Sequence, residues 1–130
     1  MPLVRISLLP GRSAAEKAAI AEAVHRALVA TAGVPADDRF QVVEELPADG
    51  LVFDPGYLGF QRSRALVVVQ VFLNVGRTVE VKQALYAAIA EGLARAAGVR
   101  PDDVLVNLVE VPRENWSFGG GRMSYPPAPA

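Results

Sequence analysis

The sequence predicts an α/β domain of the α+β type, in which two tandem β-α-β units form a four-stranded mixed sheet with both helices on one face. The first observation behind this is a repeat, because the two halves of the 130-residue chain align without a gap at an offset of 65 positions. The second is that each half places a segment of helical periodicity between two short β-rich segments. The third is general, since a strand–helix–strand connection is almost always a right-handed parallel crossover.

The internal repeat keeps its register through helix, turn and strand. Two copies are too few for a solenoid, so we predict one domain over residues 1–130, built from repeats 1–64 and 65–130. The clearest matches place Gly11-Arg12-Ser13 on Gly76-Arg77-Thr78, Gly33-Val34 on Gly98-Val99, and Asp37-Asp38 on Asp102-Asp103.

The first unit begins with a predicted strand over residues 3–9. Ser13 followed by Glu16 has the spacing of a capping box, and it predicts the start of a helix over residues 14–32. A second strand follows over residues 40–46.

The second unit repeats this order. Residues 65–73 are almost wholly apolar, as expected for a central strand that is buried on both faces. Thr78 is the predicted cap of a helix over residues 79–97, Gly98 ends that helix, and residues 104–111 form the last strand.

Composition excludes several classes of function. The net charge of −1 and pI of about 5.8 disfavour binding to nucleic acid or to an anionic membrane. The absence of cysteine excludes disulfides, zinc–thiolate sites and thiol nucleophiles. No apolar run is long enough for a membrane span, and we expect a cytoplasmic protein. The mean hydropathy of +0.26 comes from Ala, Val and Leu, and it favours an apolar surface that faces another subunit.

Three polar groups that are distant in the sequence are predicted to meet at one end of the sheet. Pro2 and Asp38 open the two strands of a parallel crossover, so both lie at the end where these strands begin. If the two units run antiparallel to each other, the third strand brings the turn 74–77 back to the same end. Val67, the repeat partner of Pro2, is internal and has no free amine, so one chain carries one such site.

The chemistry of Pro2 depends on removal of Met1, which exposes a secondary amine. A free α-amino group has a pKa near ~8, which burial and the neighbouring Arg77 would lower and Asp38 would raise. A lowered pKa makes the nitrogen a general base, whereas a raised pKa keeps it cationic and suited to polarising a carbonyl. The sequence leaves both possibilities open.

Several stretches carry a resemblance to a known family. They are the start Met1-Pro2-Leu3, the turn Gly76-Arg77-Thr78, and the segments Gly33-Val34-Pro35-Ala36-Asp37-Asp38-Arg39-Phe40-Gln41 and Asn115-Trp116-Ser117-Phe118-Gly119-Gly120-Gly121-Arg122. With the doubled β-α-β unit, they resemble the tautomerase superfamily, with its 4-oxalocrotonate tautomerase-like or MIF-like fold. Within it, the malonate semialdehyde decarboxylase-like group is the most similar.

The resemblance implies a homotrimeric enzyme that acts on a small carboxylate without a metal or organic cofactor. It implies that Pro2 is the catalytic amine, Asp38 its carboxylate partner, and Arg77 the group that binds the substrate carboxylate. The candidate substrate-binding residues beside Arg77 are Asn74 from the same turn and the apolar wall of Trp116, Phe118 and Tyr125.

The chain departs from the decarboxylase pattern at one turn. Those enzymes carry Arg-Pro-Arg where this chain has Asn74-Val75-Gly76-Arg77, so one guanidinium is missing. Decarboxylation needs the substrate carboxylate held out of plane, and one guanidinium controls this less well than two. We therefore predict a cofactor-free tautomerase that acts on a small 2-oxo acid through Pro2. The alternatives are a malonate semialdehyde decarboxylase or hydratase acting on a 3-oxo acid, and a non-catalytic trimeric scaffold.

Structural interpretations compete with some of these assignments. Asp38 could be a turn carboxylate like its repeat partner Asp103, and Arg77 could serve helix entry like Arg12. Trp116 and Phe118 could pack against another subunit, and this role is compatible with forming the substrate wall.

Three further charged or titratable residues receive other assignments. We interpret His25 as a partly exposed helix residue, and Arg62 and Arg64 as solvated residues at the start of the third strand. The two arginines remain a reserve for a second anion contact.

Overall fold

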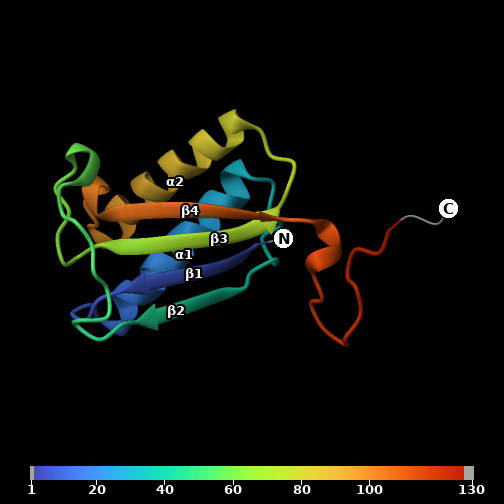
Figure 1. The fold of residues 1–130 in the computed structure, drawn as a ribbon, viewed down its shortest axis with the longest axis horizontal. Helices are drawn as coiled ribbons and strands as arrows, with labels where there is room; N and C mark the ends of the chain where they lie inside the picture. The colour runs from blue at the N-terminus through green and yellow to red at the C-terminus, as the bar shows by residue number, and fades with distance from the viewer. Residues whose placement is uncertain (1, 128–130) are drawn as a thin grey trace.

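The computed structural model describes residues 2–127 and confirms the predicted fold class (Figure 1). Three single-turn 3-10 helices (57–59, 101–103 and 113–115) supplement six main elements, whereas the sequence patterns predicted none of the three. The main elements are β1 (Leu3–Leu8), α1 (Ala14–Thr31), β2 (Gln41–Glu45), β3 (Val67–Asn74), α2 (Val79–Ala97) and β4 (Val104–Val111).

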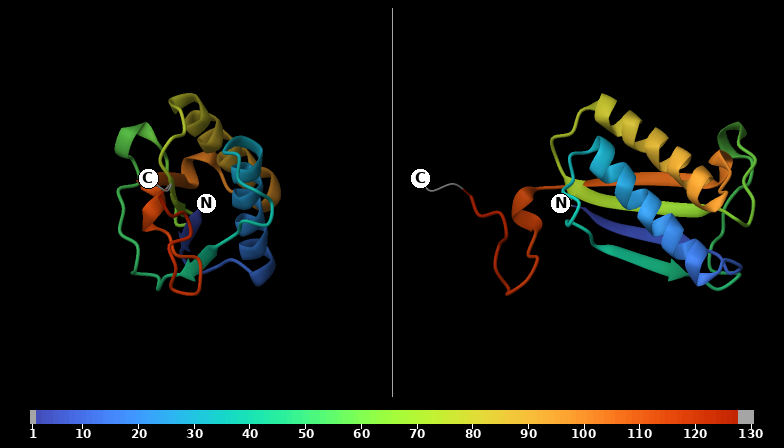
Figure 2. Two further views of the ribbon diagram at one scale, coloured as in Figure 1. Left: turned by 90° about the vertical axis from the view of Figure 1, so that its right-hand side faces the viewer. Right: turned by 180° about the vertical axis from the view of Figure 1, so that it is seen from behind.

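The strands form one mixed sheet in the order β2-β1-β3-β4. β1 pairs with β2 in parallel and with β3 in antiparallel fashion, and β3 pairs with β4 in parallel. β1 and β2 therefore begin at the end of the sheet where β3 and β4 finish, which we call the Pro2 end (Figure 1). Both helices cover the same face, as the view from behind shows (Figure 2).

The core lies between that face and the helices. Alternate residues of β1 and β3 point into it, because successive side chains of a strand face opposite sides of the sheet. Helical spacing supplies the other half of the core. The fully buried side chains include Val4, Ile6 and Leu8 from β1, Val67, Val69 and Val71 from β3, Ile20, Val24 and Leu28 from α1, and Leu85, Ile89 and Leu93 from α2.

The other face of the sheet is not covered by any of the residues 2–127. Leu3, Val42 and Leu105 are 37%, 44% and 41% exposed and come from three different strands. Exposed apolar residues on adjacent strands mark a surface suited to contact with another protein chain.

The predicted helix caps are confirmed. Ser13 and Glu16 form the reciprocal capping box of α1, and the Thr78 hydroxyl accepts from the Val81 N–H at the start of α2. Gly98 ends α2 with φ of 64°, a left-handed conformation that glycine adopts without the penalty of a Cβ atom.

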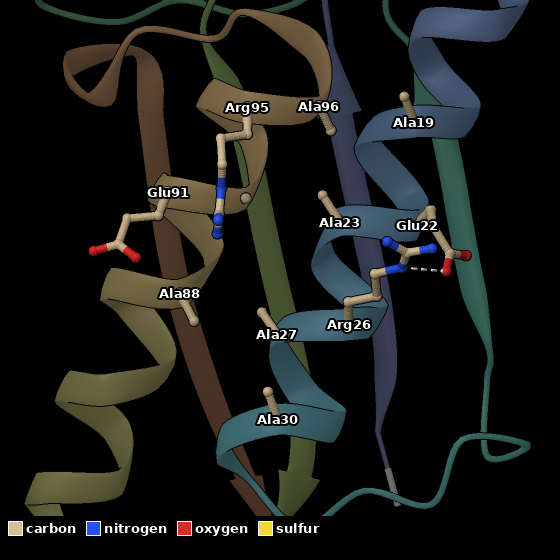
Figure 3. A pocket seen from close by; sticks show the side chains of 11 residues that line it. Ala19, Glu22, Ala23, Arg26, Ala27, Ala30, Ala88, Glu91, Arg95 and Ala96 are labelled. Atoms are coloured by element: carbon tan, nitrogen blue, oxygen red, sulfur yellow. Dashed lines mark hydrogen bonds and ion pairs between the residues drawn. The ribbon is translucent and has the colours of Figure 1, made fainter.

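Small residues let the two helices approach closely on the outside of the molecule (Figure 3). A Cβ atom added at Gly92 would lie 3.5 Å from the Ala23 Cβ. The resulting shallow groove is lined by alanines and by ion-paired residues such as Glu22 and Arg26. It lies on the helices, whereas the predicted reactive residues lie at the Pro2 end of the sheet. Within residues 2–127, no helix is both long and apolar enough to cross a membrane.

Candidate active site

Strand pairing brings Pro2 and Asp38 to the same end of the sheet. Val4 pairs with Gln41, and the Val4 N–H donates to the Phe40 carbonyl over 2.9 Å. Pro2 lies two residues before Val4 and Asp38 two residues before Phe40, so the parallel register carries both to this end. Both side chains are buried, with Asp38 only 6% exposed. The predicted meeting of an amino-terminal proline with a carboxyl group is consistent with this register.

The surroundings of Asp38 disfavour its negative charge. Burial raises the pKa of its carboxyl above the ordinary value, because the charged form loses hydration. Asp37 raises the pKa further, whereas His25 lowers it. A carboxyl group with such surroundings is suited to exchanging a proton or to pairing with a neighbouring cation.

β3 delivers Asn74 to the same end. Leu3 pairs with Phe72 across the antiparallel ladder, so the next residues of β3 run past Pro2. Asn74 is 7% exposed, and its Oδ1 accepts a 2.6 Å hydrogen bond from the indole Nε1 of Trp116. Because the oxygen is occupied in this way, the amide presents its N–H groups as donors elsewhere.

Arg77 follows in the turn between β3 and α2. Its Nε donates to the Ala32 carbonyl over 3.0 Å, and its Nη1 donates to the Asn74 carbonyl over 3.2 Å. Gly76 permits this turn through its φ of 123°, a conformation that L side chains rarely adopt. The guanidinium is thus held between the end of α1 and the end of β3. In the described part of the chain its Nη2 makes no hydrogen bond.

Aromatic side chains of the C-terminal segment gather at the Pro2 end. The Trp116 and Phe118 rings stack with centroids 5.1 Å apart, and Tyr125 meets Phe118 edge-on at 6.0 Å. Phe40 stacks on Phe118 at 5.5 Å and adds a member that the sequence analysis had not assigned to the site. The sequence feature that could have indicated Phe40 is its position, two residues after Asp38 and directly before β2.

The aromatic segment has its own internal support. The Ser124 N–H donates to the Trp116 carbonyl over 3.0 Å, and the Phe118 N–H donates to the Ser124 hydroxyl over 2.9 Å. Gly120 and Gly121 both have φ of 67° and turn the chain back between these bonds. The segment leaves β4 at the Pro2 end, where the orange and red ribbon folds back on itself (Figure 2).

The interpretation of His25 as partly exposed is wrong. Its side chain is 7% exposed, and its Nε2 lies 2.8 Å from the Ala36 carbonyl oxygen. The loop that leads to Asp38 passes over this side of α1 and covers the ring. Helical periodicity cannot reveal such cover, because it identifies only the face toward the sheet.

Arg62 and Arg64 cannot supply a second anion contact within one chain. They precede the start of β3, where Val67 pairs with Leu8 at the opposite end of the sheet from Pro2. Arg62 donates to the carbonyls of Tyr57 and Asp54, and Arg64 donates to the Ala48 carbonyl. Both guanidinium groups therefore support the segment between the two repeats.

The opposite end of the sheet holds the repeat equivalents of the site residues. Asp103 is 1% exposed, and its carboxylate accepts bonds of 2.6 Å and 2.7 Å from the Ser63 N–H and hydroxyl. Arg12 donates to the Ala65 carbonyl over 2.5 Å. The segment entering β3 thus occupies both groups, and Val67 lies inside the chain.

The reactive groups at the Pro2 end form a set suited to proton transfer on a small anion. They combine a buried carboxyl group, a guanidinium that can bind a carboxylate, an amide donor and a stacked aromatic wall. Among residues 2–127, no group of three or more His, Cys, Asp or Glu side chains could hold a metal ion. Removal of Met1 concerns a residue outside those described, and it stays a prediction.

Comparison with known proteins gives consistent matches over most of the chain. Two family models, both described as tautomerase enzyme, match residues 38–119 and 2–61. The probable tautomerase YusQ of Bacillus subtilis strain 168 is 37% identical over 122 residues, which cover 94% of this chain and 96% of that protein.

Solved structures agree with these matches. A crystal structure of FG41 malonate semialdehyde decarboxylase inhibited by 3-bromopropiolate superposes with a TM-score of 0.89 and 43% identity, covering 95% of this chain and 93% of that one. A symmetric trimer of wild-type fused 4-OT superposes with a TM-score of 0.77 and 28% identity, covering 94% and 95% of the two chains.

Proposed function

This chain belongs to the tautomerase family of enzymes, and we propose that it catalyses keto–enol tautomerisation of a small 2-oxo carboxylic acid through the nitrogen of Pro2. The observation that carries the proposal is the pairing of β1 with both β2 and β3, which brings Pro2, Asp38 and the turn at Asn74–Arg77 to one end of the sheet. Family membership establishes that the chain is a tautomerase-family enzyme. The substrate class and the roles of individual residues are our proposal.

The reaction needs a group that accepts and returns a proton. In ketonisation, one proton leaves the enol oxygen and one is added to the other carbon of the double bond, next to the carbon that bears this oxygen. The atoms and the charge are unchanged overall. A neutral Pro2 nitrogen takes the first proton and supplies the second. Enzymes commonly use two nearby titratable groups for this chemistry, with surroundings that shift the pKa values of the two groups in opposite directions.

The neighbouring residues hold the substrate and set the basicity of the nitrogen. Arg77 binds the substrate carboxylate, and the Asn74 amide donates to the substrate oxygen. The positive charge of Arg77 lowers the pKa of the Pro2 amine, whereas ionised Asp38 raises it. The aromatic wall of Trp116 and Phe118 excludes water and strengthens these interactions.

A second candidate is decarboxylation or hydration of malonate semialdehyde or a related 3-oxo acid. The 43% identity to FG41 malonate semialdehyde decarboxylase favours it. The neutral Asn74 at the end of β3 weighs against it, because the decarboxylase pattern described above places two guanidinium groups near this turn. Tautomerisation requires one carboxylate anchor and one base, and both are available.

We also propose that the active enzyme is a homotrimer. The uncovered face of the sheet exposes Leu3, Val42 and Leu105, and a fused 4-OT of the same fold forms a symmetric trimer. Contact between sheets would bury this apolar surface, for which water is a poor solvent. Sedimentation velocity at several concentrations tests this directly, and a stable monomer at micromolar concentration contradicts it.

The function is tested by assaying the purified protein with the enol of phenylpyruvate and with malonate semialdehyde. We expect ketonisation to be the faster reaction, and replacing Pro2 with alanine should reduce it by roughly 100- to 10,000-fold. Intact mass should show that Met1 is absent from the active protein. Activity on neither substrate, or full activity of Pro2→Ala, would refute the proposal.

A further inference from the structure

The segment that carries Asp38 is fastened to helix α1 by three polar contacts. Arg39 pairs with Glu22 at 2.5 Å, and the Gln41 side chain donates to the Ala21 carbonyl over 2.8 Å. The third contact joins His25 Nε2 and the Ala36 carbonyl over 2.8 Å. Asp38 lies between the attachment points.

The histidine contact differs from the Arg39–Glu22 ion pair in being buried. Glu22 and Arg39 are partly exposed, and exposed ion pairs contribute little to stability. The His25 ring is 7% exposed, so loss of its bond would leave polar groups away from water. A carbonyl oxygen can only accept, so Nε2 carries the proton and donates it.

We infer that His25 is a positioning residue, which holds the Asp38 carboxyl in place through its hydrogen bond to the Ala36 carbonyl. Ala36 lies two residues before Asp38, and the Asp38 N–H donates back to the Pro35 carbonyl over 3.0 Å. This bond closes a turn around Ala36, so fixing the Ala36 carbonyl fixes the direction in which Asp38 leaves the turn. The inference deepens the proposed function, since it rests on the role of Asp38 at Pro2.

The charge on His25 adds an electrostatic link to the same carboxyl. A protonated His25 favours ionised Asp38 and lowers the pKa of that carboxyl. The other charged groups that line the hollow at the ring are Glu22 and Arg26 on α1 and Arg39 on the loop. Asp37, also on the loop, raises the pKa of Asp38. Glu22 is engaged by both arginines, so this neighbourhood contains a paired carboxylate and two paired cations. Glutamine at position 25 keeps an N–H donor but has no charge, which separates the two links.

The test compares wild type with His25→Gln, His25→Phe and the matched control Lys17→Gln. Lys17 also joins α1 to β2, through Glu45 at 3.4 Å, but at the opposite end of the sheet. The measurements are kcat, KM and the pKa of Asp38 from carboxyl ¹³C NMR, with the resonance assigned by Asp38→Asn. Circular dichroism confirms that each variant is folded.

We expect His25→Phe to lower kcat by roughly 10- to 100-fold with little change in KM, because a misplaced reacting group slows chemistry more than binding. His25→Gln should recover kcat to within about threefold of wild type, since an amide N–H still reaches the carbonyl. Both variants should raise the Asp38 pKa, and Lys17→Gln should change neither quantity.

Two results would overturn the inference. One is a folded His25→Phe with the kcat and the Asp38 pKa of wild type. The other is a His25→Gln that loses as much activity as His25→Phe. If wild type turns over neither substrate, the proposed function fails, but the NMR titration still decides this inference. An Asp38 pKa unchanged by His25→Phe then overturns it.

Discussion

The indole nitrogen of Trp116 lies 2.6 Å from the side-chain oxygen of Asn74 and joins the C-terminal segment to the end of β3. The bond spans 42 positions in the sequence and connects the aromatic wall to the polar part of the candidate site. It also sets the orientation of the Asn74 amide, since the oxygen faces the indole and the N–H groups face away. One hydrogen bond thus controls both the wall and the donor.

Removing the indole donor should destabilise the protein. Trp116→Phe leaves the buried Asn74 oxygen without its partner, which costs about 1–3 kcal/mol of unfolding free energy, in addition to lost packing. Urea unfolding measures this cost. The double variant Trp116→Phe/Asn74→Leu is the control, because it removes both polar partners and should cost less than the sum of the single variants. Strict additivity would show that the bond contributes nothing.

Placing a second guanidinium at position 74 should shift the enzyme toward decarboxylation. Asn74→Arg provides two cations near the substrate carboxylate, and charge-assisted hydrogen bonds are about twice as strong as neutral ones. We expect kcat/KM for malonate semialdehyde to rise about tenfold or more, with ketonisation reduced. Asn74→Gln, which lengthens the side chain without adding charge, should not show the gain. An equal effect of both variants would exclude charge as the cause.

The stability of the protein should depend on pH through Asp38. Burial raises the pKa of this carboxyl, so the folded state holds its proton more tightly than the unfolded state. Stability is therefore lost as pH rises from about 4, the ordinary value, through the higher folded pKa. Asp38→Asn lacks this loss, so its advantage over wild type should be near zero in acid and grow toward neutral pH.

Chemical denaturation of both proteins between pH 3.5 and 7.5 measures this difference and cancels the contribution of other carboxylates. The matched control is Asp37→Asn, because Asp37 is adjacent but exposed. Its stability should differ from that of wild type by an amount that changes little across this pH range. An Asp38→Asn curve parallel to wild type would show that the folded and unfolded pKa values of Asp38 are equal.

Asp103 should matter for stability and not for catalysis. Its carboxylate accepts two bonds from Ser63 and is 1% exposed, so Asp103→Asn weakens the attachment of the segment entering β3. We expect a loss of about 2 kcal/mol in unfolding free energy with kcat unchanged. Asp38→Asn should show the opposite pattern, with low kcat and retained stability. A large fall in kcat for Asp103→Asn, measured under conditions in which the variant is fully folded, would contradict this assignment.

Much of the fold could be predicted from the sequence because its signals are local. Ser13 with Glu16, Thr78 and Gly98 mark helix ends through bonds within a few residues, and the structure confirms them. The limits of a strand depend also on contacts that are distant in the sequence. β3 begins at Val67 and not at residue 65, because the preceding residues bond to the loop 48–57 and to Asp103.

The site could be predicted in outline and not in detail. Pro2, Asp38 and the turn from Asn74 to Arg77 lie at one end of the sheet, because strand direction determines which end each residue reaches. Their roles in catalysis stay predictions. The sequence did not indicate Phe40 as a site residue, and it suggested an exposed His25, which is buried. Their contacts with Phe118 and Ala36 depend on how loops fold over the sheet and over α1. Loop paths depend on many weak contacts and leave no periodic pattern in the sequence.

The sequence by itself determined the two β-α-β units and their caps, because periodicity, capping and the repeat act over short range or by direct comparison. Only the tertiary structure decided that Asp38 and its repeat partner Asp103 have different surroundings. Asp103 is occupied by Ser63 from the segment that enters β3. The segment that joins the two repeats runs to this end of the sheet, whereas Asp38 lies at the other end, in a loop that His25 of α1 holds through the Ala36 carbonyl. The physical reason is chain connectivity, which gives two similar sequences different neighbours.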